Sequence, residues 1–461
     1  MESLSVFLKH KPLYYKEIDH ERVHVAYNTL KPHIKRPTTL HVVGTNGKGS
    51  TGRMIAHMAW QNARSKEQGA SSREQGVGVG RGSLSPMSQG ALSVGHFSSP
   101  HILRFNERIW IDGADASDAV LEVAHERLYR ILGQDMSDAL SYFEYTTLLA
   151  LVVFEDCDLM VLEAGLGGEY DATNVCDKEL SVFTPIGIDH QAFLGETIEE
   201  IASTKLRSMQ HRALLAPQPY PEVETVAKEI AADYGAELRV CGGEGLALSV
   251  ERLEKGEIAK EEPPLRSRDF SPANDVPLSV ERLVLSVESV DALASEDQES
   301  LEELARTKGW PDFLVQNARV AMAALGWLEI PFDMEALRDL ELFGRFYPWR
   351  ENVRIDVGHN PLAARAIVEA LLPQTVLIYN ALSDKDAPEV LRILAPKLKR
   401  VEIIPIETER ATDIQRLEIA IDAAGLPYCT YENILSPDEH YLVFGSFYVV
   451  EAFLRQVKIK N

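Results

Sequence analysis

One short stretch limits what this chain can fold into: the glycine-rich sequence GTNGKGS at residues 44–50. A short apolar run, residues 40–43, precedes it, and Ile55, Met58 and Ala59 recur after it at helical spacing. Strand, glycine-rich turn and helix in this order predict a phosphate-binding loop, because the glycines let the backbone approach a phosphate and the helix start offers free N–H groups. The spacing differs from the general GxxxxGK[ST] pattern, so an ordinary glycine-rich turn is the alternative.

Strand and helix patterns alternate over most of the 461 residues, which indicates an α/β fold with a mainly parallel sheet. The length suggests about three domains, or two large ones. From residue 352 the alternation restarts and describes a complete small Rossmann-like domain of about 110 residues. We therefore expect a nucleotide-binding domain over residues 1–342 and a C-terminal domain over residues 343–461.

Two segments interrupt this alternation. Residues 65–95 hold seven glycines and seven serines, a composition that buries too little apolar surface to offset chain entropy, so we expect a flexible insertion there. The acidic stretch 244–303 contains LSVERL twice, at residues 248–253 and 278–283. Repeat folds need three or more units, so we interpret this duplication as part of a solvated face rather than a functional array.

Composition excludes several classes of protein. The 47 basic and 70 acidic residues give a net charge of −23, which argues against a general nucleic-acid binder. The longest apolar run, residues 148–154, is far shorter than the roughly 18 residues of a transmembrane helix, and residues 1–11 lack a signal-peptide pattern. Four cysteines without a CxxC pair are too few for a disulfide scaffold. We expect a reduced, cytoplasmic monomer that binds neither nucleic acid nor membrane.

Polar residues follow the predicted strands of the first domain. Lys48 and Ser50 would supply a charge for the outer phosphates and a hydroxyl near a bound metal. Glu163 ends an apolar run and could hold Mg²⁺ beside the loop, although a carboxylate that caps the next turn is equally compatible with its position. Asp189 and His190 end the following strand, which the pattern predicts over residues 180–188. A lone histidine is more often structural, but three strand ends that meet at one edge favour a site.

The second domain carries a similar arrangement. Asp356 and His359 flank Gly358 at a strand-to-helix switch, and Ser446 follows a later strand in the same way. Helix starts at such switches bind anions, so we expect this edge to receive a substrate carboxylate. Lys205 lies on a predicted helix over residues 199–209, where its composition indicates only a solvated charge. Together these residues predict phosphoryl transfer across a cleft, without naming a substrate.

The motifs resemble those of the dihydrofolate synthase/folylpolyglutamate synthase family, in the Mur ligase superfamily, from about residue 15 to about residue 454. The motifs that carry the resemblance are HVVGTNGKGS (41–50), FSSPHILRFNERI (97–109), FEYTTLLAL (143–151), VLEAGLGGEYDATN (161–174), TPIGIDHQAFLG (184–195), Lys205, VQNA (315–318), GRF (344–346), IDVGHNPLAA (355–364), SDKD (383–386) and LVFGSFY (442–448). The resemblance implies a P-loop ATPase domain of the Mur ligase central-domain type and a smaller Rossmann-like C-terminal domain that binds glutamate. Glu169 and Tyr170 replace the family's usual Arg-Leu pair.

The resemblance also implies a role for individual residues. ATP would be bound by Gly47, Lys48, Gly49, Ser50, Asn317, Arg345 and Asp356. Two Mg²⁺ ions would be held by Ser99, Glu163, His190 and a carbamylated Lys205. The pterin substrate would lie against Phe143, Glu144, Tyr170, Asp171 and Ala172, and the incoming glutamate against His359 and Ser446. Lys48, Lys205 and His359 would be the catalytic residues.

The implied reaction is ATP-dependent addition of L-glutamate to dihydropteroate or to folates through an acyl phosphate. Three alternatives remain: a Mur-type cell-wall amino-acid ligase, a P-loop ATPase of other purpose, and a non-catalytic nucleotide-binding module. The folate-branch sequence SSPHILRFNERI argues against the first, and the IDVGHNP segment against the second. Retention of Lys48, Glu163, His190 and Asp356 argues against the third.

Overall fold

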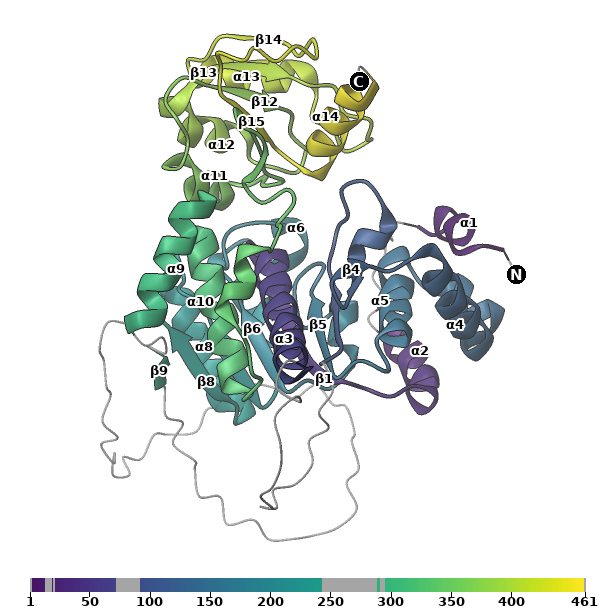
Figure 1. Cartoon of the computed structure of the whole chain (residues 1–461). Coiled ribbons are helices and arrows are strands. Elements are labelled where there is room, and N and C mark those ends of the chain that lie inside the picture. Colours follow the sequence, from purple (N-terminus) through teal and green to yellow (C-terminus); the bar gives the residue numbers. More distant parts are fainter. Residues whose placement is uncertain are drawn as a thin grey trace, which may run out of the picture.

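The computed structural model describes residues 2–12, 19, 21–71, 92–242, 288–290 and 295–459, which form two β-sheets with helices packed around them (Figure 1). The LSVERL duplication and residues 72–91 of the predicted insertion lie outside the described residues. Within the described part, no helix is both long and apolar enough to cross a membrane.

The first sheet has nine strands in the order β4-β3-β2-β5-β1-β6-β7-β8-β9. Their bounds are β1 (Thr38–Val43), β2 (Val94–Phe97), β3 (Ile109–Ile111), β4 (Ala114–Asp115), β5 (Leu159–Glu163), β6 (Leu180–Phe183), β7 (Arg212–Leu215), β8 (Glu237–Cys241) and β9 (Glu288–Val290). All pairs from β2 to β9 are parallel, and β3 and β4 add an antiparallel edge. Because β1 lies between β5 and β6, the carboxyl ends of these three strands share one edge.

Helices cover both faces of this sheet, which explains why its central strands are buried and nearly continuous in apolar residues. The helices of this part are α1 (Leu4–Lys9), α2 (Arg22–Leu30), α3 (Lys48–Ser71), α4 (Asp118–Ala139), α5 (Tyr142–Val153), α6 (Gln191–Leu194), α7 (Ile198–Leu206), α8 (Pro221–Tyr234), α9 (Ser295–Lys308) and α10 (Asp312–Trp327), with 3₁₀ turns η1 (Lys31–His33), η2 (Phe105–Arg108), η3 (Ala172–Val175) and η4 (Met334–Arg338).

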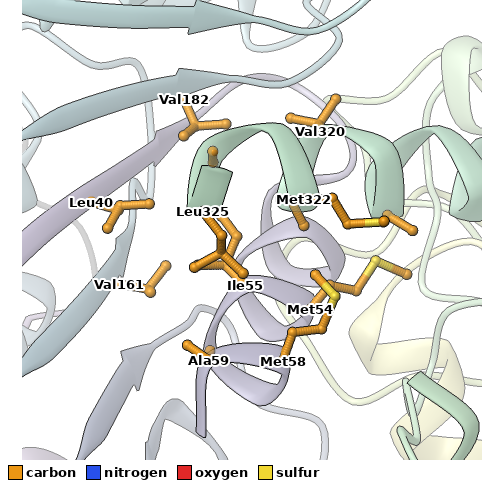
Figure 2. Close-up of a cluster of buried hydrophobic side chains, with 14 of the residues drawn as sticks. Leu40, Met54, Ile55, Met58, Ala59, Val161, Val182, Val320, Met322 and Leu325 are labelled. Carbon is orange, nitrogen blue, oxygen red and sulfur yellow. The ribbon is translucent and has the colours of Figure 1, made fainter. Parts of the chain in front are cut away.

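The main core of this part lies between the sheet and the pair α3 and α10 (Figure 2). Leu40, Val161 and Val182 come from the three central strands and meet Ile55 of α3 and Leu325 of α10. Separate apolar clusters lie under α4 and α5 and under α7 and α8. Residues 54–60 of the helix that begins at Lys48 are thereby fixed, so the loop before that helix has a rigid support.

The second sheet has six strands in the order β10-β11-β15-β12-β13-β14. Its elements are β10 (Tyr347–Arg350), β11 (Val353–Ile355), α11 (Pro361–Val368), β12 (Thr375–Tyr379), α12 (Ala387–Leu394), η5 (Ala395–Lys397), β13 (Leu398–Ile403), α13 (Ile414–Ala423), β14 (Tyr428–Thr430), β15 (Tyr441–Phe444) and α14 (Phe447–Ile459). All pairs except β10–β11 are parallel. The domain boundary between residues 342 and 343 stays a prediction.

The predicted α/β class is confirmed, and the differences from the expected elements are local. The strand expected over residues 180–188 ends at Phe183, and Pro185 just beyond it has no backbone N–H to donate to a ladder. The insertion expected over residues 65–95 begins as helix, because α3 continues to Ser71, and β2 starts at Val94. The edge strands β10 and β14 were not expected from the pattern.

Replacing Leu325 by alanine should lower the free energy of unfolding by about 2–5 kcal/mol, because the fully buried side chain would leave a cavity between α3 and α10. Leu372, which is 53% exposed, is the matched control, and its replacement by alanine should change stability by at most about 0.5 kcal/mol. Urea unfolding followed by circular dichroism measures both. Equal losses for the two variants would contradict this view of the core.

Candidate active site

The glycine-rich loop joins β1 to α3 and is shaped by close backbone approaches. A Cβ on Gly44 would lie 2.0 Å from Thr184 Oγ1, and Gly47 has a φ of +84°, which a residue with a side chain rarely adopts. Lys48 Nζ donates to the carbonyls of Gly44 and Thr45, both at 3.2 Å. Burial lowers the pKa of Lys48, and the nearby Glu163 carboxylate opposes that shift. The loop therefore presents a partly buried ammonium group at the start of α3.

Asn317 of α10, to which the resemblance assigns a contact with ATP, lies against this loop. Its Nδ2 donates to Ser50 Oγ at 2.8 Å, and Ser50 Oγ donates to the Gly47 carbonyl at 3.0 Å. A Cβ on Gly47 would lie 2.9 Å from Asn317 Oδ1, so the Asn317 side chain packs closely against the loop. These contacts tie α10 to the first turn of α3.

Glu163 lies at the end of β5, buried beside the loop. Its Oε2 accepts from the Ser99 amide at 3.1 Å, and a Cβ on Gly49 would lie 3.3 Å from Oε2 and 3.1 Å from Arg345 Nη2. Burial raises the pKa of Glu163, whereas the charges of Lys48 and Arg345 lower it. The buried Glu163 carboxylate therefore lies between the Ser99 backbone and the glycine-rich loop, and Arg345 approaches it from a distant segment of the chain.

Asp356 organises the segment that carries Arg345. Its Oδ2 accepts from the Phe346 amide at 2.8 Å and its Oδ1 from the Gly358 amide at 2.6 Å. The Arg345 guanidinium lies 5.4 Å from the centre of the Phe447 ring. Asp356 is buried, which raises its pKa, and the charge of Arg345 lowers it. The predicted nucleotide residues of the second sheet therefore lie together, next to Gly49 and Glu163.

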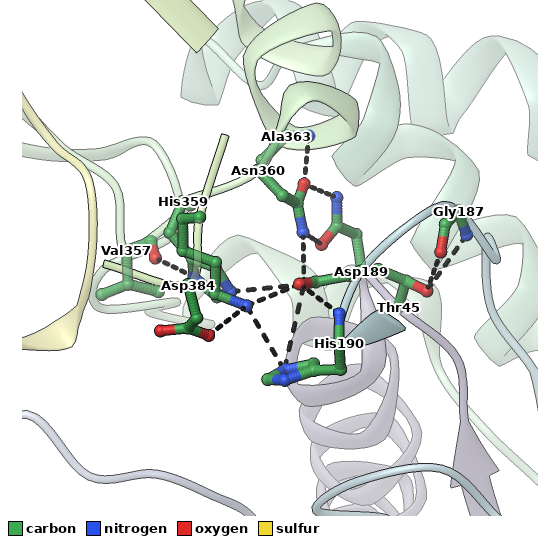
Figure 3. Close-up of polar contacts among 12 residues, drawn as sticks. Thr45, Gly187, Asp189, His190, Val357, His359, Asn360, Ala363 and Asp384 are labelled. Carbon is green, nitrogen blue, oxygen red and sulfur yellow. Dashed lines mark hydrogen bonds and ion pairs between the residues drawn. The ribbon is translucent and has the colours of Figure 1, made fainter. Parts of the chain in front are cut away.

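Asp189 is a centre of polar contacts between the two parts of the chain (Figure 3). Lys385 Nζ lies 2.5 Å from its Oδ1, and Asn360 Nδ2 and His359 Nε2 lie 3.1 and 3.6 Å from its Oδ2. Burial alone would raise the pKa of Asp189, but His359, Lys385 and His190 hold that pKa well below its usual range. One buried carboxylate from the first sheet is thus held by three side chains from the second.

Two further contacts surround this carboxylate. The side-chain amides of Asn46 and Asn360 pair reciprocally, at 3.0 and 3.1 Å, between the glycine-rich loop and the first turn of α11. His190 has a left-handed φ of 54°, and its Nε2 lies 3.4 Å from Lys385 Nζ. Burial lowers the pKa of His190 to about 4, so the ring is neutral at pH 7 and can act as a ligand.

Lys205 is buried, not solvated as its helix composition alone suggested. Its Nζ donates to the Gly44 carbonyl at 3.1 Å, and a Cβ on Gly168 would lie 2.4 Å from the Lys205 carbonyl oxygen. Burial lowers the pKa of Lys205 to about 7, and the charge of Lys48 contributes in the same direction. A large share of this side chain is therefore a neutral amine near pH 7.

The residues predicted for the pterin side lie on two adjoining segments. The Phe143 ring would be 2.6 Å from a Cβ on Gly165, so α5 and the loop after β5 touch. Tyr170 is 55% exposed, whereas Ala172 is buried. Asp171 is also buried, and its carboxylate accepts from the Leu166 amide at 2.8 Å. The structure therefore places the Asp171 carboxylate against its own loop.

Two predicted residues have structural partners of their own. Both Glu144 oxygens accept from Arg22, at 2.8 to 3.1 Å, and Oε2 also accepts from the Ser141 amide at 2.7 Å. Ser446 Oγ accepts from the Val449 amide at 3.2 Å and so caps α14. Ser446 follows Gly445, whose amide donates to the Gly358 carbonyl at 2.9 Å, which brings Ser446 near His359.

Sequence reasoning did not assign a role to Lys385, Asn360, Asn46 or Arg22. Three of them stood in motifs already noted, SDKD, GHNP and GTNG. The structure shows why they matter, because the partners that they contact in the other part of the chain are 171 to 314 residues away. Arg22 pairs with Glu144 across 122 residues, and no local pattern marked it. Among the described residues, no three His, Cys, Asp or Glu side chains gather closely enough to hold a metal by themselves.

The nine-stranded sheet with its glycine-rich loop, joined through Asp189 to a second α/β sheet, defines a P-loop protein of the Mur ligase type. No protein-family model matches the chain. The chain is 32% identical to the crystal structure of Helicobacter pylori folylpolyglutamate synthetase, with a TM-score of 0.67 and coverage of 99% of this chain and 98% of that one. The chain belongs to the dihydrofolate synthase/folylpolyglutamate synthase family.

A comparison of sequences agrees with this assignment, and a comparison of structures agrees with the fold. The Haemophilus influenzae dihydrofolate synthase/folylpolyglutamate synthase is 26% identical over 90% of this chain and 88% of its own length. A bifunctional folylpolyglutamate synthase/dihydrofolate synthase with Mn, AMPPNP and L-glutamate bound is 23% identical, with a TM-score of 0.70 and coverage of 99% and 98%. This second likeness concerns the fold.

Replacing Lys385 by methionine should lower the free energy of unfolding at pH 7 by about 1–3 kcal/mol, because Asp189 would stay buried with one hydrogen-bonded cation fewer. Asp189 has a depressed pKa, so its contribution is present at pH 7 and is lost only as pH falls below the unfolded value of about 3.9. Lys399→Met, which removes a half-exposed ion pair with Glu439, should cost at most about 1 kcal/mol.

Chemical unfolding of Lys385→Met, of Asp189→Asn and of the double variant measures the coupling between the two side chains. The double variant should lose less than the sum of the two single losses, because the side chains share one contact. Simple additivity would show that the Asp189–Lys385 ion pair does not hold the two sheets together.

Proposed function

We propose that this chain is an ATP-dependent ligase that adds L-glutamate to dihydropteroate, to folates, or to both. One observation carries the proposal. Asp189 leaves the same edge of the first sheet as the glycine-rich loop, and it contacts His359 and Asn360, which lie at the edge of the second sheet. A ligase that couples ATP to amide formation needs a phosphate site and an amino-acid site in reach of one another. The relative with Mn, AMPPNP and L-glutamate bound supports this pairing of ligands.

Each group of residues takes a defined part in this proposal. Gly47, Lys48, Gly49 and Ser50 would hold the ATP phosphates, since their amides and the Lys48 ammonium surround the start of α3. Asn317 reaches the same turn through Ser50, and Arg345 and Asp356 would contact ATP from the second sheet. His359 and Ser446 would lie beside the incoming glutamate.

Two Mg²⁺ ions would be held by Ser99, Glu163, His190 and carbamylated Lys205. The fit rests on the buried Glu163 carboxylate next to the loop and on the neutral His190 ring. The described residues hold no cluster of three carboxylates or histidines, and Mg²⁺ commonly binds through one or two carboxylates plus substrate phosphates. Bound Mg²⁺ would offset negative charge on the transferring phosphoryl group.

The reaction is then a sequence of two displacements. A substrate carboxylate oxygen attacks the γ-phosphorus of ATP, the bridging P–O bond to ADP breaks, and an acyl phosphate forms. The glutamate amine attacks the acyl carbon, loses a proton, and inorganic phosphate leaves with the former C–O electron pair. Lys48 would stabilise charge on the phosphoryl oxygens, and packing of the two sheets around Asp189 would exclude water that could hydrolyse the acyl phosphate.

The experiment that tests this proposal is ATP turnover with dihydropteroate or a folate, with and without L-glutamate. ADP should form only when both substrates are present, and mass spectrometry should detect the glutamylated product. A Lys48→Ala variant should keep its fold and lose about a thousandfold or more in turnover, since one charge at a developing anion is removed. Turnover with peptidoglycan precursors, or without any acceptor, would favour the Mur-type and general ATPase alternatives.

Lys205 allows a separate prediction. If the buried amine is carbamylated, Lys205→Ala should sharply lower turnover, and a short-chain carboxylic acid should restore part of it by supplying the missing carboxylate-like group. Carbamate formation needs a free amine, and the pKa of about 7 provides one near neutral pH. The control is Lys228→Ala, because Lys228 is a half-exposed lysine on α8 paired with Glu224.

Crystals or intact-mass spectra prepared with bicarbonate should show the added group on Lys205. Full activity of Lys205→Ala together with an unmodified lysine would refute this assignment. In that case Lys205 would be a structural amine that binds the Gly44 carbonyl.

A further inference from the structure

A buried ammonium group that the proposed function does not use lies beneath the loop over residues 165–174. This loop carries Tyr170, Asp171 and Ala172, which are predicted to contact the pterin. Lys178, between η3 and β6, is 3% exposed, and burial lowers its pKa to about 8. Its Nζ lies 3.3 Å from His41 Nδ1, donates to the Ser208 carbonyl at 3.1 Å, and donates to Asn174 Oδ1. A lysine ammonium has three N–H donors, so these three contacts use all of them.

The first of these contacts fixes the direction of a chain of hydrogen bonds. An ammonium can only donate, so His41 Nδ1 accepts, and the neutral ring carries its proton on Nε2. Nε2 then donates to Thr173 Oγ1 at 2.7 Å, and the Thr173 hydroxyl donates to Asp171 Oδ1 at 2.5 Å. Burial lowers the pKa of His41 far below its usual value, which keeps the ring neutral. Every donor points from the Lys178 cation toward the Asp171 carboxylate.

Asp171 in turn holds its own loop. Its Oδ2 accepts from the Leu166 amide at 2.8 Å, and its Oδ1 also accepts from the Thr173 amide at 2.9 Å. A second path leads from Lys178 to the same loop, because Asn174 Nδ2 donates to the Glu169 carbonyl at 2.9 Å. Lys178 therefore reaches the loop by two paths, one ending at Leu166 and one at Glu169.

The third contact leads toward Lys205. Ser208, whose carbonyl accepts from Lys178, donates its hydroxyl to the Lys205 carbonyl at 2.7 Å. The loop also meets this helix directly, since the Glu169 amide donates to the Thr204 carbonyl at 2.9 Å. One ammonium thus links β1, the loop over residues 165–174 and the end of α7.

Of these three segments, the loop depends most on this link for its position. The strand that carries His41 is fixed by parallel pairing with β5 and β6, and Lys205 is fixed by α7 and the Gly44 carbonyl. Residues 165–171 belong to no helix or strand, so the Asp171, Asn174 and Thr204 contacts set their place. A change at Lys178 should therefore move the loop and leave the phosphate-binding turn where it is.

We propose that Lys178 is a positioning residue that holds the loop over residues 165–174 against β1 and so determines affinity for the pterin substrate rather than for the nucleotide. The substrate part rests on the proposed function. The positional part does not, because it concerns only the hydrogen bonds from Lys178 to the loop.

The test compares Lys178→Met with a matched control, Lys308→Met. Lys308 on α9 also donates all three N–H groups to protein, here to the carbonyls of Leu337, Arg338 and Leu340 at 3.0, 2.7 and 2.8 Å. Those carbonyls belong to or adjoin η4 and make no contact with the loop. Each variant therefore loses three contacts of a lysine ammonium group, but only Lys178→Met loses them beside the loop.

Three measurements on the full-length chain give the outcome. In Lys178→Met, hydrogen exchange should become faster in peptides that cover residues 165–175, and the ¹⁵N signals of His41 should no longer report a single Nε2–H tautomer. The Kd for dihydropteroate should rise by about tenfold, the loss expected for one positioning hydrogen bond to a charged group. The Kd for ADP should stay within about twofold, and Lys308→Met should change none of these.

Unchanged exchange over residues 165–175 in Lys178→Met would overturn the proposal, and so would an equal loss of dihydropteroate and ADP binding. If Lys178→Met fails to fold, His41→Leu takes its place, since leucine fills a similar volume and offers no acceptor to Lys178 Nζ. The same exchange and affinity changes are expected there. If the unaltered chain binds no folate, the proposed function fails, while the exchange measurement still decides the position of the loop.

Discussion

The parallel pairing of β1 with β5 on one side and β6 on the other is the constraint on which the site depends. Register places His41 opposite Leu162 and Val43 opposite Phe183, so the three strands end at nearly the same level. The glycine-rich loop, Glu163 and the segment that leads to Asp189 therefore leave the sheet together. Helices α3 and α10 pack on one face of the sheet and hold β1 between β5 and β6.

Charge burial is the cost of this arrangement, and opposite charges offset it. Lys48 and Arg345 lie close to the buried Glu163 carboxylate, and Lys385 brings a cation to the Asp189 carboxylate. Removal of a single member would leave a buried charge without its partner, which is more costly than the absence of the whole set. The site is therefore organised before any substrate arrives, as catalysis by fixed charges requires.

Much of this site could be predicted from sequence because its signals are local. GTNGKGS lies between a strand and a helix, and Glu163 and His190 follow apolar runs, so their positions follow from strand ends in a parallel sheet. Contacts between distant segments could not be predicted in this way. Lys385 and Asp189, Lys178 and His41, and Arg22 and Glu144 are pairs whose members lie 122 to 196 residues apart. The burial of Lys205 was also hidden, because it depends on how α7 packs against Gly168.

The amide pair of Asn46 and Asn360 has a consequence for the response to salt. Dissolved ions screen exposed charges over roughly 8–10 Å and affect buried contacts much less. The amide pair is neutral and the neighbouring Asp189–Lys385 ion pair is buried, so added salt weakens neither contact as much as it weakens an ion pair in solvent. The docked arrangement of the two sheets should therefore persist at high salt.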